Sequence, residues 1–441
     1  MSAPEHPAAS ENDYEALGIS AYELVRELYP LCRSITGQGV RDTLGILERY
    51  VPLTRTSVAT GTRVFDWEVP REWNIRDAYI KDHTGHRVVD FRASNLHVVS
   101  YSVPVRTRMK LQDLKAHLHS IPEQPDWIPY RTSYYRDTWG FCLTQRQLDA
   151  LLDDEYDVCI DSTLEPGHLT LAELFVPGQV EDEVLIYTHT CHPSLCNDNL
   201  SALAVAALLA RRWASSGPHH FSCRFVFGPG TIGSITWLHG NETRAPAIRH
   251  GLVLASLGDR GHLTYKRSRR GDADIDRIAG YVVAGHAGTC EDFSPYGYDE
   301  RQFCSPGFNL PVGRLTRTPN GTYPEYHTSA DGLDFITPSA LGDSLRACEQ
   351  ILGIVEQNGR FLNLSPKCEP RLGPRGLFRA TGGLSPGEFE HALLWVLNQS
   401  DGDVDLLTIA LKSRLDFQVI ASAAKALVDA GLLQRVGRQR T

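Results

Sequence analysis

The sequence lacks several features that would assign it to a specialised class of protein. Its 441 residues contain no run of about eighteen apolar residues that could span a bilayer. The first dozen residues, MSAPEHPAASEN, lack the apolar segment of a secretory signal, so we expect a cytoplasmic protein. Ten cysteines are scattered without the spacing of a disulfide framework, which predicts reduced thiols. A net charge of -9 does not favour a general binder of nucleic acid or of acidic membranes.

What is present is typical of a globular protein with several domains. Hydrophobic residues make up 42% of the chain and charged residues 22%, which is the balance of a soluble fold. A chain of 441 residues is too long for one ordinary core, so two or three domains are expected.

The N-terminal part predicts two helices followed by a β-rich segment. Ser20 and Glu23 have capping-box spacing and predict a helix that starts at Ser20 and stops at Pro30. A second helix is expected at about 40–50. From about 62 to 142 short β-branched and aromatic runs alternate with Pro, Gly and Asn. This texture predicts a small inserted β-rich domain or, alternatively, an extended N-terminal part of the main core.

Strands and helices alternate from about 156 to 359. HLTLAELFV, VLIYTHT, CRFVFG and GLVLASLG are candidate strands, and LSALAVAALLARRW is a helix that is apolar on nearly every face. This alternation predicts an α/β domain around a largely parallel sheet flanked by helices. In such a sheet, ligands bind where strands end and helices begin.

The tail reads as a winged helix-turn-helix. EFEHALLWVL, DLLTIALKS and FQVIASAAKALVDAG predict three short helices, and LLQRV predicts a strand of the wing. Residues 371–441 hold nine Lys or Arg against seven Asp or Glu, and the third helix offers few donors for phosphates or base edges. We therefore favour a role in protein contact or substrate shielding over DNA binding.

These patterns give three predicted domains. An α/β domain is expected over 15–60 and 150–365, an inserted β-rich domain over 61–149, and the winged helix over 371–441.

One stretch, YTHTCHPSLCNDNLSAL at 187–203, concentrates the side chains that bind metals. His189 ends a predicted strand and Asp198 stands at the start of the next helix. Alone, Asp198 would serve as a helix N-cap and His189 would fit a buried core histidine. Together they favour a zinc site, because zinc takes neutral imidazole and carboxylate ligands that rigid elements hold at one point.

Other residues of this stretch widen the choice. His192 and Cys191 can reach the same space. A thiol nucleophile at Cys191 or Cys196, with His189 or His192 as its base, stays an alternative to a metal.

Further acids and imidazoles stand at predicted strand ends downstream. EYHTSAD, ASLGDRG and YGYDERQF supply them, and each is weak evidence alone. The candidates are Glu325, His327, Asp331, Asp259, Tyr298, Asp299 and Glu300.

Several phrases resemble the zinc aminopeptidase superfamily, which includes bacterial leucyl aminopeptidases and glutaminyl cyclases. They are VLIYTHTCHPSLCNDNLSAL, FGPGTIGSITWL and HTSAD. With VFDWEVPREWNIRDAYI and SNLHVVSYS, the chain resembles, over about 20–438, a bacterial aminopeptidase-like family with an inserted β-rich domain and a C-terminal winged helix.

The resemblance implies a peptidase-like mixed α/β sheet flanked by helices and a site for one or two zinc ions. By it, His189 matches the first ligand, Asp198 the shared carboxylate and His327 the last histidine. Asp259 is the nearest match for the remaining aspartate ligand, and His192 is a further candidate ligand.

Two departures from the superfamily pattern bear on mechanism. The His-x-Asp motif is here His189-Thr190-Cys191, so the carboxylate that orients the ligand histidine is absent. The glutamate expected before the Gly-Ser pair is also absent, and Gly230 stands in that place. In the superfamily such glutamates act as general base and as metal ligand.

Three functions remain open from the sequence. The first is a zinc hydrolase of aminopeptidase type that acts on a small aminoacyl or short peptide-like substrate, with Glu325 or Glu300 as a relocated base and Tyr298 stabilising the oxyanion. The second is a zinc-dependent deacylase or acyl-transfer enzyme that acts on a sugar or another biosynthetic intermediate. The third is a metal-binding scaffold without turnover. The sequence leaves open a homo-oligomer.

Overall fold

The computed structural model describes residues 11–377 and 387–436. The chain forms two compact units with the boundary after Glu349. Parts of the predicted winged-helix range, 378–386 and 437–441, and most of the opening dozen residues lie outside the described residues. Among the described residues, no helix combines the length and apolar character needed to cross a membrane.

The first unit is built on an eight-stranded mixed sheet with the order β1-β10-β12-β11-β13-β16-β14-β15. Its centre is parallel, because β11 pairs in that sense with both β12 and β13, and β13 with β16. The strand β10 joins β12 in the antiparallel sense and carries β1 at the edge. The bounds are β1 Thr54–Ala59, β10 His168–Val176, β11 Val180–His189, β12 Phe221–Gly228, β13 Ile248–Leu254, β14 Thr264–Lys266, β15 Thr289–Glu291 and β16 Val312–Thr316.

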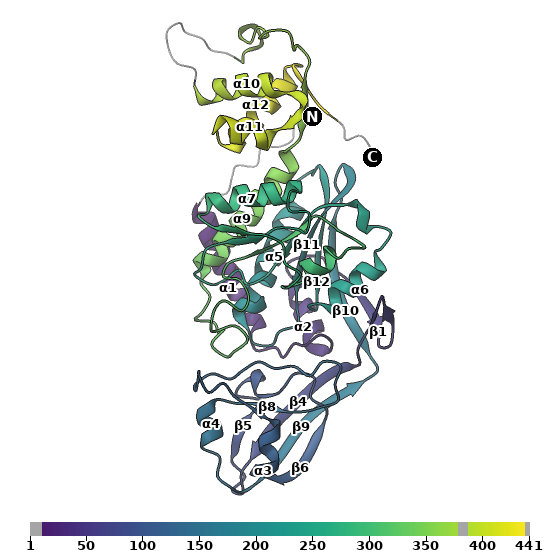
Figure 1. The fold of residues 1–441 in the computed structure, drawn as a ribbon, viewed down its shortest axis with the longest axis vertical. Coiled ribbons are helices and arrows are strands. Elements are labelled where there is room, and N and C mark those ends of the chain that lie inside the picture. Colours follow the sequence, from purple (N-terminus) through teal and green to yellow (C-terminus); the bar gives the residue numbers. More distant parts are fainter. Residues whose placement is uncertain (1–10, 378–386, 437–441) are drawn as a thin grey trace. The chain divides into compact units, whose positions relative to one another are not determined.

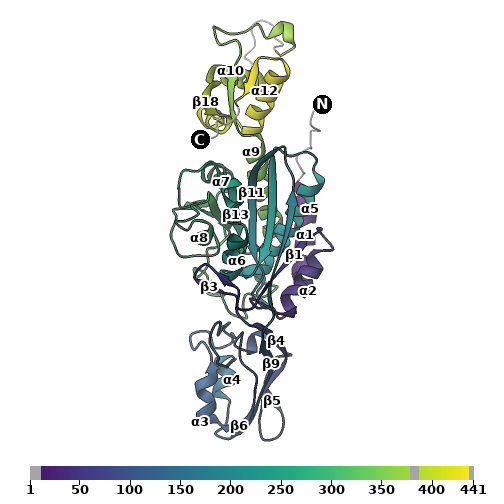
Figure 2. The same ribbon diagram turned by 90° about the vertical axis from the view of Figure 1, so that its right-hand side faces the viewer.

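Helices cover both faces of this sheet, which explains why its central strands are apolar on both sides. Every residue of β12 is buried, and α5 is buried from Ala202 to Ala210. Figure 2 shows α1, α2 and α5 on one side of the sheet, with α6, α7 and α8 on the other. The bounds are α1 Glu11–Leu28, α2 Gln38–Leu47, α5 Ala202–Ser215, α6 Ile232–Gly240, α7 Asp274–Gly285, α8 Glu300–Phe303 and α9 Pro338–Gln357.

A second, antiparallel sheet with the order β5-β4-β9-β6 belongs to the β-rich segment and is separate from the main sheet (Figure 1). Trp73 of β4 is buried in it, and its indole N–H donates to the Ser102 carbonyl at 2.9 Å. Its elements and neighbours are β2 Arg63–Val64, β3 Trp67–Glu68, β4 Glu72–Lys81, β5 Arg87–Asp90, β6 Val105–Lys110, α3 Leu111–Leu114, β7 Leu118–His119, β8 Phe141–Cys142, α4 Gln145–Asp149 and β9 Glu155–Glu165.

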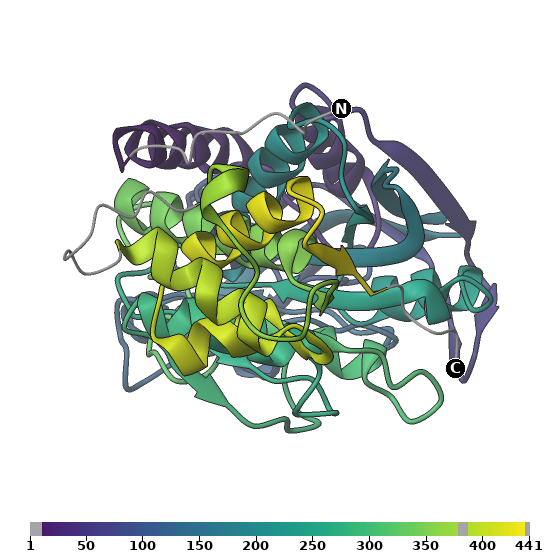
Figure 3. The ribbon, with the colours of Figure 1, turned by 90° about the horizontal axis from the view of Figure 1, so that it is seen from above.

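The second unit is a winged helix, as the tail pattern predicts. Three helices, α10 Glu388–Gln399, α11 Leu406–Ser413 and α12 Phe417–Asp429, are the yellow-green to yellow ribbons of Figure 3. A small antiparallel sheet has the order β18-β17-β19, with β17 Arg360–Asn363, β18 Asp401–Asp405 and β19 Leu433–Arg435. The predicted preference for a role other than DNA binding stays a prediction.

The predicted start of the first helix is wrong. Helix α1 begins at Glu11, nine residues before the expected cap. The Ser20 hydroxyl donates to the carbonyl of Ala16 at 3.0 Å, the bond of a serine inside a helix, so it caps nothing. The capping-box spacing therefore arose by chance within a longer helix.

Candidate metal centre

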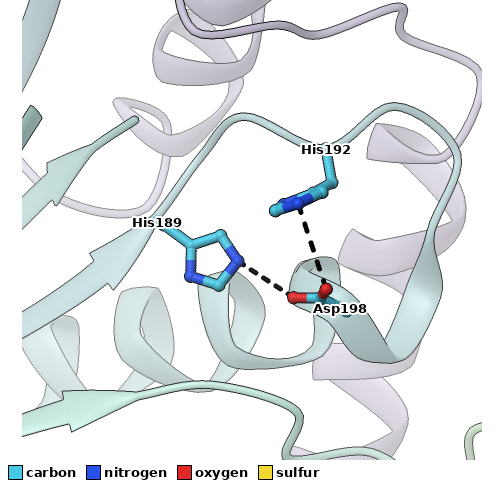
Figure 4. Close-up of side chains that lie close together, drawn as sticks. All are labelled: His189, His192 and Asp198. Atoms are coloured by element: carbon cyan, nitrogen blue, oxygen red, sulfur yellow. Dashed lines mark hydrogen bonds and ion pairs between the residues drawn. The ribbon is translucent and has the colours of Figure 1, made fainter. Parts of the chain in front are cut away.

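The buried Asp198 is the hub of a cluster of three imidazoles. His189 Nε2 lies 3.0 Å from its Oδ1, and His327 Nε2 lies 3.0 Å from its Oδ2. His192 Nε2 is 4.0 Å from the same Oδ2. Figure 4 shows the rings of His189 and His192 both turned toward the Asp198 carboxylate. The structure thus brings four of the five predicted metal ligands to one point.

Short local elements deliver these side chains. His189 is the last residue of β11, and Asp198 lies in the tight turn Cys196–Ser201 that leads into α5. The carboxylate of Asp331 fixes that turn, because it accepts from the backbone N–H of Asn197 at 2.6 Å and of Asp198 at 2.9 Å. Burial raises the pKa of Asp331 to about 8 despite these two donors. Asp331, one of the sequence candidates, therefore supports the cluster through the backbone.

The second sheet's segment holds the remaining histidine. His327 has a left-handed backbone with φ of 58°, and its carbonyl accepts from the N–H of Tyr130 at 2.8 Å. The Tyr130 ring meets both His192 and His327 edge-on, at 5.2 Å between centroids. The β-rich segment therefore contributes one wall of the site.

The protonation states suit metal binding. Burial lowers the pKa of His192 to about 3, so its imidazole is neutral. Burial alone would raise the pKa of Asp198, but the neighbouring His192 and the hydrogen bonds from His189 and His327 hold it well below its usual value. A neutral imidazole and an ionised carboxylate are the forms that bind a cation.

The donor set fits a divalent metal ion. His189, His192 and Asp198 each offer a ligand atom within 4.8 Å of the others. Two or three imidazoles with one carboxylate are ligands that zinc accepts. The Nδ1 atom of His189 is buried and finds no hydrogen-bond partner among the described residues, consistent with the missing carboxylate at position 191.

Asp259, the fifth predicted ligand, is engaged elsewhere. Its Oδ1 accepts from the Thr318 hydroxyl at 2.6 Å and from the Gly261 N–H at 2.7 Å. Its Oδ2 accepts from the Asn197 side-chain amide at 2.9 Å. The carboxylate thus ties three loops together beside the cluster, and its role as a ligand stays a prediction.

Of the three predicted catalytic residues, one lines the pocket and two do not. Tyr298 stacks on His189 with 4.9 Å between ring centroids and lines the pocket beside the cluster. Glu300 is fully buried and accepts from Lys266 Nζ at 2.8 Å. Glu325 is half-buried, and neither glutamate is among the residues that line the pocket. Their catalytic roles stay predictions.

The cluster opens into a pocket of about 240 Å³. Tyrosines dominate its walls. Tyr326 stacks on His327 with 3.9 Å between ring centroids, and the hydroxyls of Tyr130 and Tyr134 lie 3.1 Å apart. The lining residues are Ile35, Tyr130, Thr132, Tyr134, His189, Cys191, His192, Gly230, Thr231, Gly297, Tyr298, Asp299, Tyr326 and His327.

The loop between β12 and α6 forms the wall where the superfamily glutamate is missing. A Cβ atom added to Gly230 would lie 3.3 Å from Cys191 Sγ, and that sulfur accepts from the Gly230 N–H at 3.2 Å. The thiol therefore borders the space that a side chain at position 230 would enter. Burial raises the pKa of Cys191 to about 12, so the thiol is neutral there.

One functional candidate was barely visible in the sequence. Asp299 lines the pocket together with Gly230 and Thr231. From the sequence it was only one of two candidate acids in the YGYDERQF segment. Two features of the sequence could have pointed to Asp299 as a replacement acid: no carboxylate stands at position 230, and Asp299 is an acid next to Tyr298 to which no role had been given. Nothing in the spacing shows that these two segments meet.

Comparisons with known proteins agree with this architecture. Residues 22–358 match the family described as "Domain of unknown function (DUF4910)", and residues 360–435 match a winged helix-turn-helix family. A Clostridium acetobutylicum protein, named for polysaccharide biosynthesis and for an aminopeptidase-like domain, is 50% identical over 423 residues, which are 95% of this chain and 97% of that protein.

Solved structures extend the likeness. A crystal structure from Clostridium acetobutylicum, described as a candidate peptidase, has a TM-score of 0.91 and 48% identity, and covers 96% of this chain and 98% of that chain. BSAP, a zinc aminopeptidase from Bacillus subtilis, has a TM-score of 0.57 and 12% identity, over 80% of this chain and 96% of its own. At that identity BSAP shows the fold alone.

The expected fold and the expected resemblance are therefore confirmed. The chain belongs to the DUF4910 family and combines an aminopeptidase-like mixed α/β fold with a C-terminal winged helix.

Proposed function

We propose that this protein is a zinc-dependent amide hydrolase that acts on a small molecule with an aminoacyl or acylamino group. The observation that carries this proposal is the convergence of His189, His192 and His327 on the buried Asp198 beside a pocket of about 240 Å³. A cavity of this size suits a small substrate better than a protein.

The residues divide the work as follows. His189, His192, Asp198 and His327 would hold the zinc ion, which would supply Lewis-acid polarisation of an amide carbonyl. The Tyr298 ring lies against His189, and its hydroxyl is 3.3 Å from the Ser256 hydroxyl. That phenol can donate a hydrogen bond to the oxygen on which negative charge develops.

A second candidate is removal of an acyl group from a biosynthetic intermediate. The Clostridium relative at 50% identity is named for polysaccharide biosynthesis, which supports an acylamino sugar as substrate. The paired hydroxyls of Tyr130 and Tyr134 offer hydrogen bonds to such a ring. An aminopeptidase would instead need a carboxylate for the free amine, and Asp299 is the one acid among the described residues that line the pocket.

Metal content of the purified protein tests the proposal. Wild type is compared with His327→Ala and with His86→Ala, which removes an exposed histidine between β4 and β5. We expect zinc in wild type and in His86→Ala, and its loss from His327→Ala after dialysis. The zinc-loaded protein is then offered aminoacyl anilides and N-acyl hexosamines, which separate the two candidate functions. Bound zinc without turnover of either panel would favour the scaffold, and absence of zinc from all three proteins would exclude the hydrolase.

A further inference from the structure

Asp299 and Glu300 each have one buried carboxylate oxygen without a hydrogen-bond partner among the described residues, but only Asp299 lines the pocket. Its Oδ1 accepts from the Thr231 N–H at 2.8 Å and from the Ser234 hydroxyl at 2.5 Å, which holds it at the start of α6. Its Oδ2 is buried and has no hydrogen-bond partner among residues 11–377 and 387–436. The residue as a whole is 1% exposed.

A buried acid that only caps a helix looks different. Asp276 lies at the start of α7, and both of its oxygens are used. Oδ1 accepts from the Tyr265 hydroxyl at 2.9 Å and from the Ser268 N–H at 2.7 Å, and Oδ2 accepts from the Ser268 hydroxyl at 2.6 Å. A carboxylate oxygen left without a donor in the interior destabilises the fold, so the free Oδ2 of Asp299 calls for a functional reason.

The surroundings of Asp299 favour proton transfer. It lines the same pocket as His189 and the vacant position at Gly230. The titratable groups that act on it are His189 on β11, Glu300 on α8, and the neutral Tyr187 and Cys191. Burial raises the pKa of Asp299, against the effects of His189 and of the Ser234 and Thr231 donors. A raised pKa makes a carboxylate a better proton acceptor.

We propose that Asp299 Oδ2 is the proton-transfer group of the hydrolysis, in place of the glutamate that is missing at position 230. This inference rests on the proposed function. Water gives a proton to Oδ2 while its oxygen bonds to the amide carbonyl carbon, and the carbonyl π electrons move onto the carbonyl oxygen. When the C–N bond breaks, its electron pair stays on nitrogen. The proton passes from Oδ2 to that nitrogen, which restores the carboxylate and yields an acid and an amine.

The variant Asp299→Asn tests this role, because an amide keeps the Oδ1 acceptor for Thr231 and Ser234 but cannot take the proton. We expect wild-type zinc content, a KM within about threefold of wild type, and a kcat lowered at least about 100-fold.

Asp276→Asn is the matched control, a buried cap without pocket contact, and we expect it to lower thermal stability and keep kcat. If Asp299→Asn keeps kcat within about tenfold, Asp299 is only a cap. A raised KM for free-amine substrates with unchanged kcat would make it an amine anchor instead.

A second readout does not depend on turnover. Acetohydroxamic acid binds metal sites as its anion, so its proton must go to the protein or to the buffer. Calorimetric titration of the zinc-loaded protein in buffers of different ionisation enthalpy counts that proton. We expect Asp299→Asn to release about one proton more per bound ligand than wild type, and equal release would overturn the inference. If wild type cleaves no amide but retains this proton, the proposed hydrolysis fails while the proton-holding role of Asp299 stands.

Discussion

Two walls of the pocket differ in how their acidic side chains are paired: one carries the candidate metal ligands, and the other carries Gly230 and Asp299. On the metal wall, both oxygens of Asp198 face imidazole nitrogens, and the backbone beneath is held by Asp331. On the neighbouring wall, which the β12–α6 loop and Asp299 form, Gly230 has no side chain and Asp299 keeps one buried oxygen without a partner among the described residues. A carboxylate with both oxygens directed at imidazoles can help to hold a cation in one place, whereas an acid with one free oxygen can exchange a proton. The contrast predicts that substitutions on one wall abolish metal binding and those on the other leave it intact.

The largest effect is expected from breaking the metal wall with Asp198→Asn. This change removes the one negative charge on which three histidines converge. Loss of an outer partner of a metal ligand lowers affinity about 10-fold to 100-fold, so loss of a ligand should lower zinc affinity by more than about 100-fold. Competition with a chromogenic chelator measures this. Asp157→Asn on β9, an exposed carboxylate, is the control, and equal affinities in the two variants would place the metal elsewhere.

How far the sequence predicts this site depends on how local each part is. His189 and Asp198 lie nine residues apart across one strand-to-helix crossing, so a motif can identify both. His327 comes from a separate segment but carries its own short motif. The α/β class likewise follows from the alternation of strands and helices, whereas the peptidase-like mixed sheet follows from the family resemblance, and both are confirmed.

The neighbouring wall could not be predicted in the same way. Asp299 and Glu300 are adjacent acids, yet one lines the pocket and the other pairs with the buried Lys266. Which of them faces the pocket depends on where α8 begins and on its contact with the β12–α6 loop. That is tertiary information, and no spacing within YGYDERQF encodes it.

The next largest effect is expected from Glu300→Gln, which tests whether Glu300 stabilises the fold while Asp299 serves the pocket. Lys266 and Arg314 are both 3% exposed on their side chains, and Glu300 lies 2.8 Å from the first and 3.8 Å from the second. Removing its charge leaves Lys266 without a carboxylate partner among the described residues and Arg314 with only the half-exposed Glu291 at 3.7 Å, which should lower the free energy of unfolding by about 3 kcal/mol. Urea unfolding measures the loss, while zinc content should stay unchanged. Full stability with lost activity would return Glu300 to the role of general base.

A smaller effect is expected from Asp259→Asn, which tests how far the metal wall extends. Each carboxylate oxygen accepts two hydrogen bonds, and an amide keeps only one such oxygen. Two bonds are therefore lost, either those from the Thr318 hydroxyl and the Gly261 N–H or those from the Asn197 amide and the Thr318 N–H. We expect a loss of about 2 kcal/mol in the free energy of unfolding with zinc retained. Metal analysis after dialysis decides the matter, because zinc lost from an otherwise folded variant would make Asp259 a ligand.

The smallest effect concerns an acid outside both walls, Glu72 at the start of β4. Burial alone would raise its pKa, but hydrogen bonds from Arg41, Asn74 and the His168 N–H lower it from 4.5 to about 2. A depressed pKa contributes stability that is complete above 4.5 and disappears as the pH falls toward about 2. Solvent screens this partly open pair, so Glu72→Gln should lower the free energy of unfolding by less than about 1 kcal/mol at neutral pH. It should also flatten the acid limb of the stability curve, as urea unfolding at a series of pH values will show. Because Glu72 touches neither wall, zinc affinity and kcat should match wild type, and a change in either would mean that the second sheet transmits strain to the pocket.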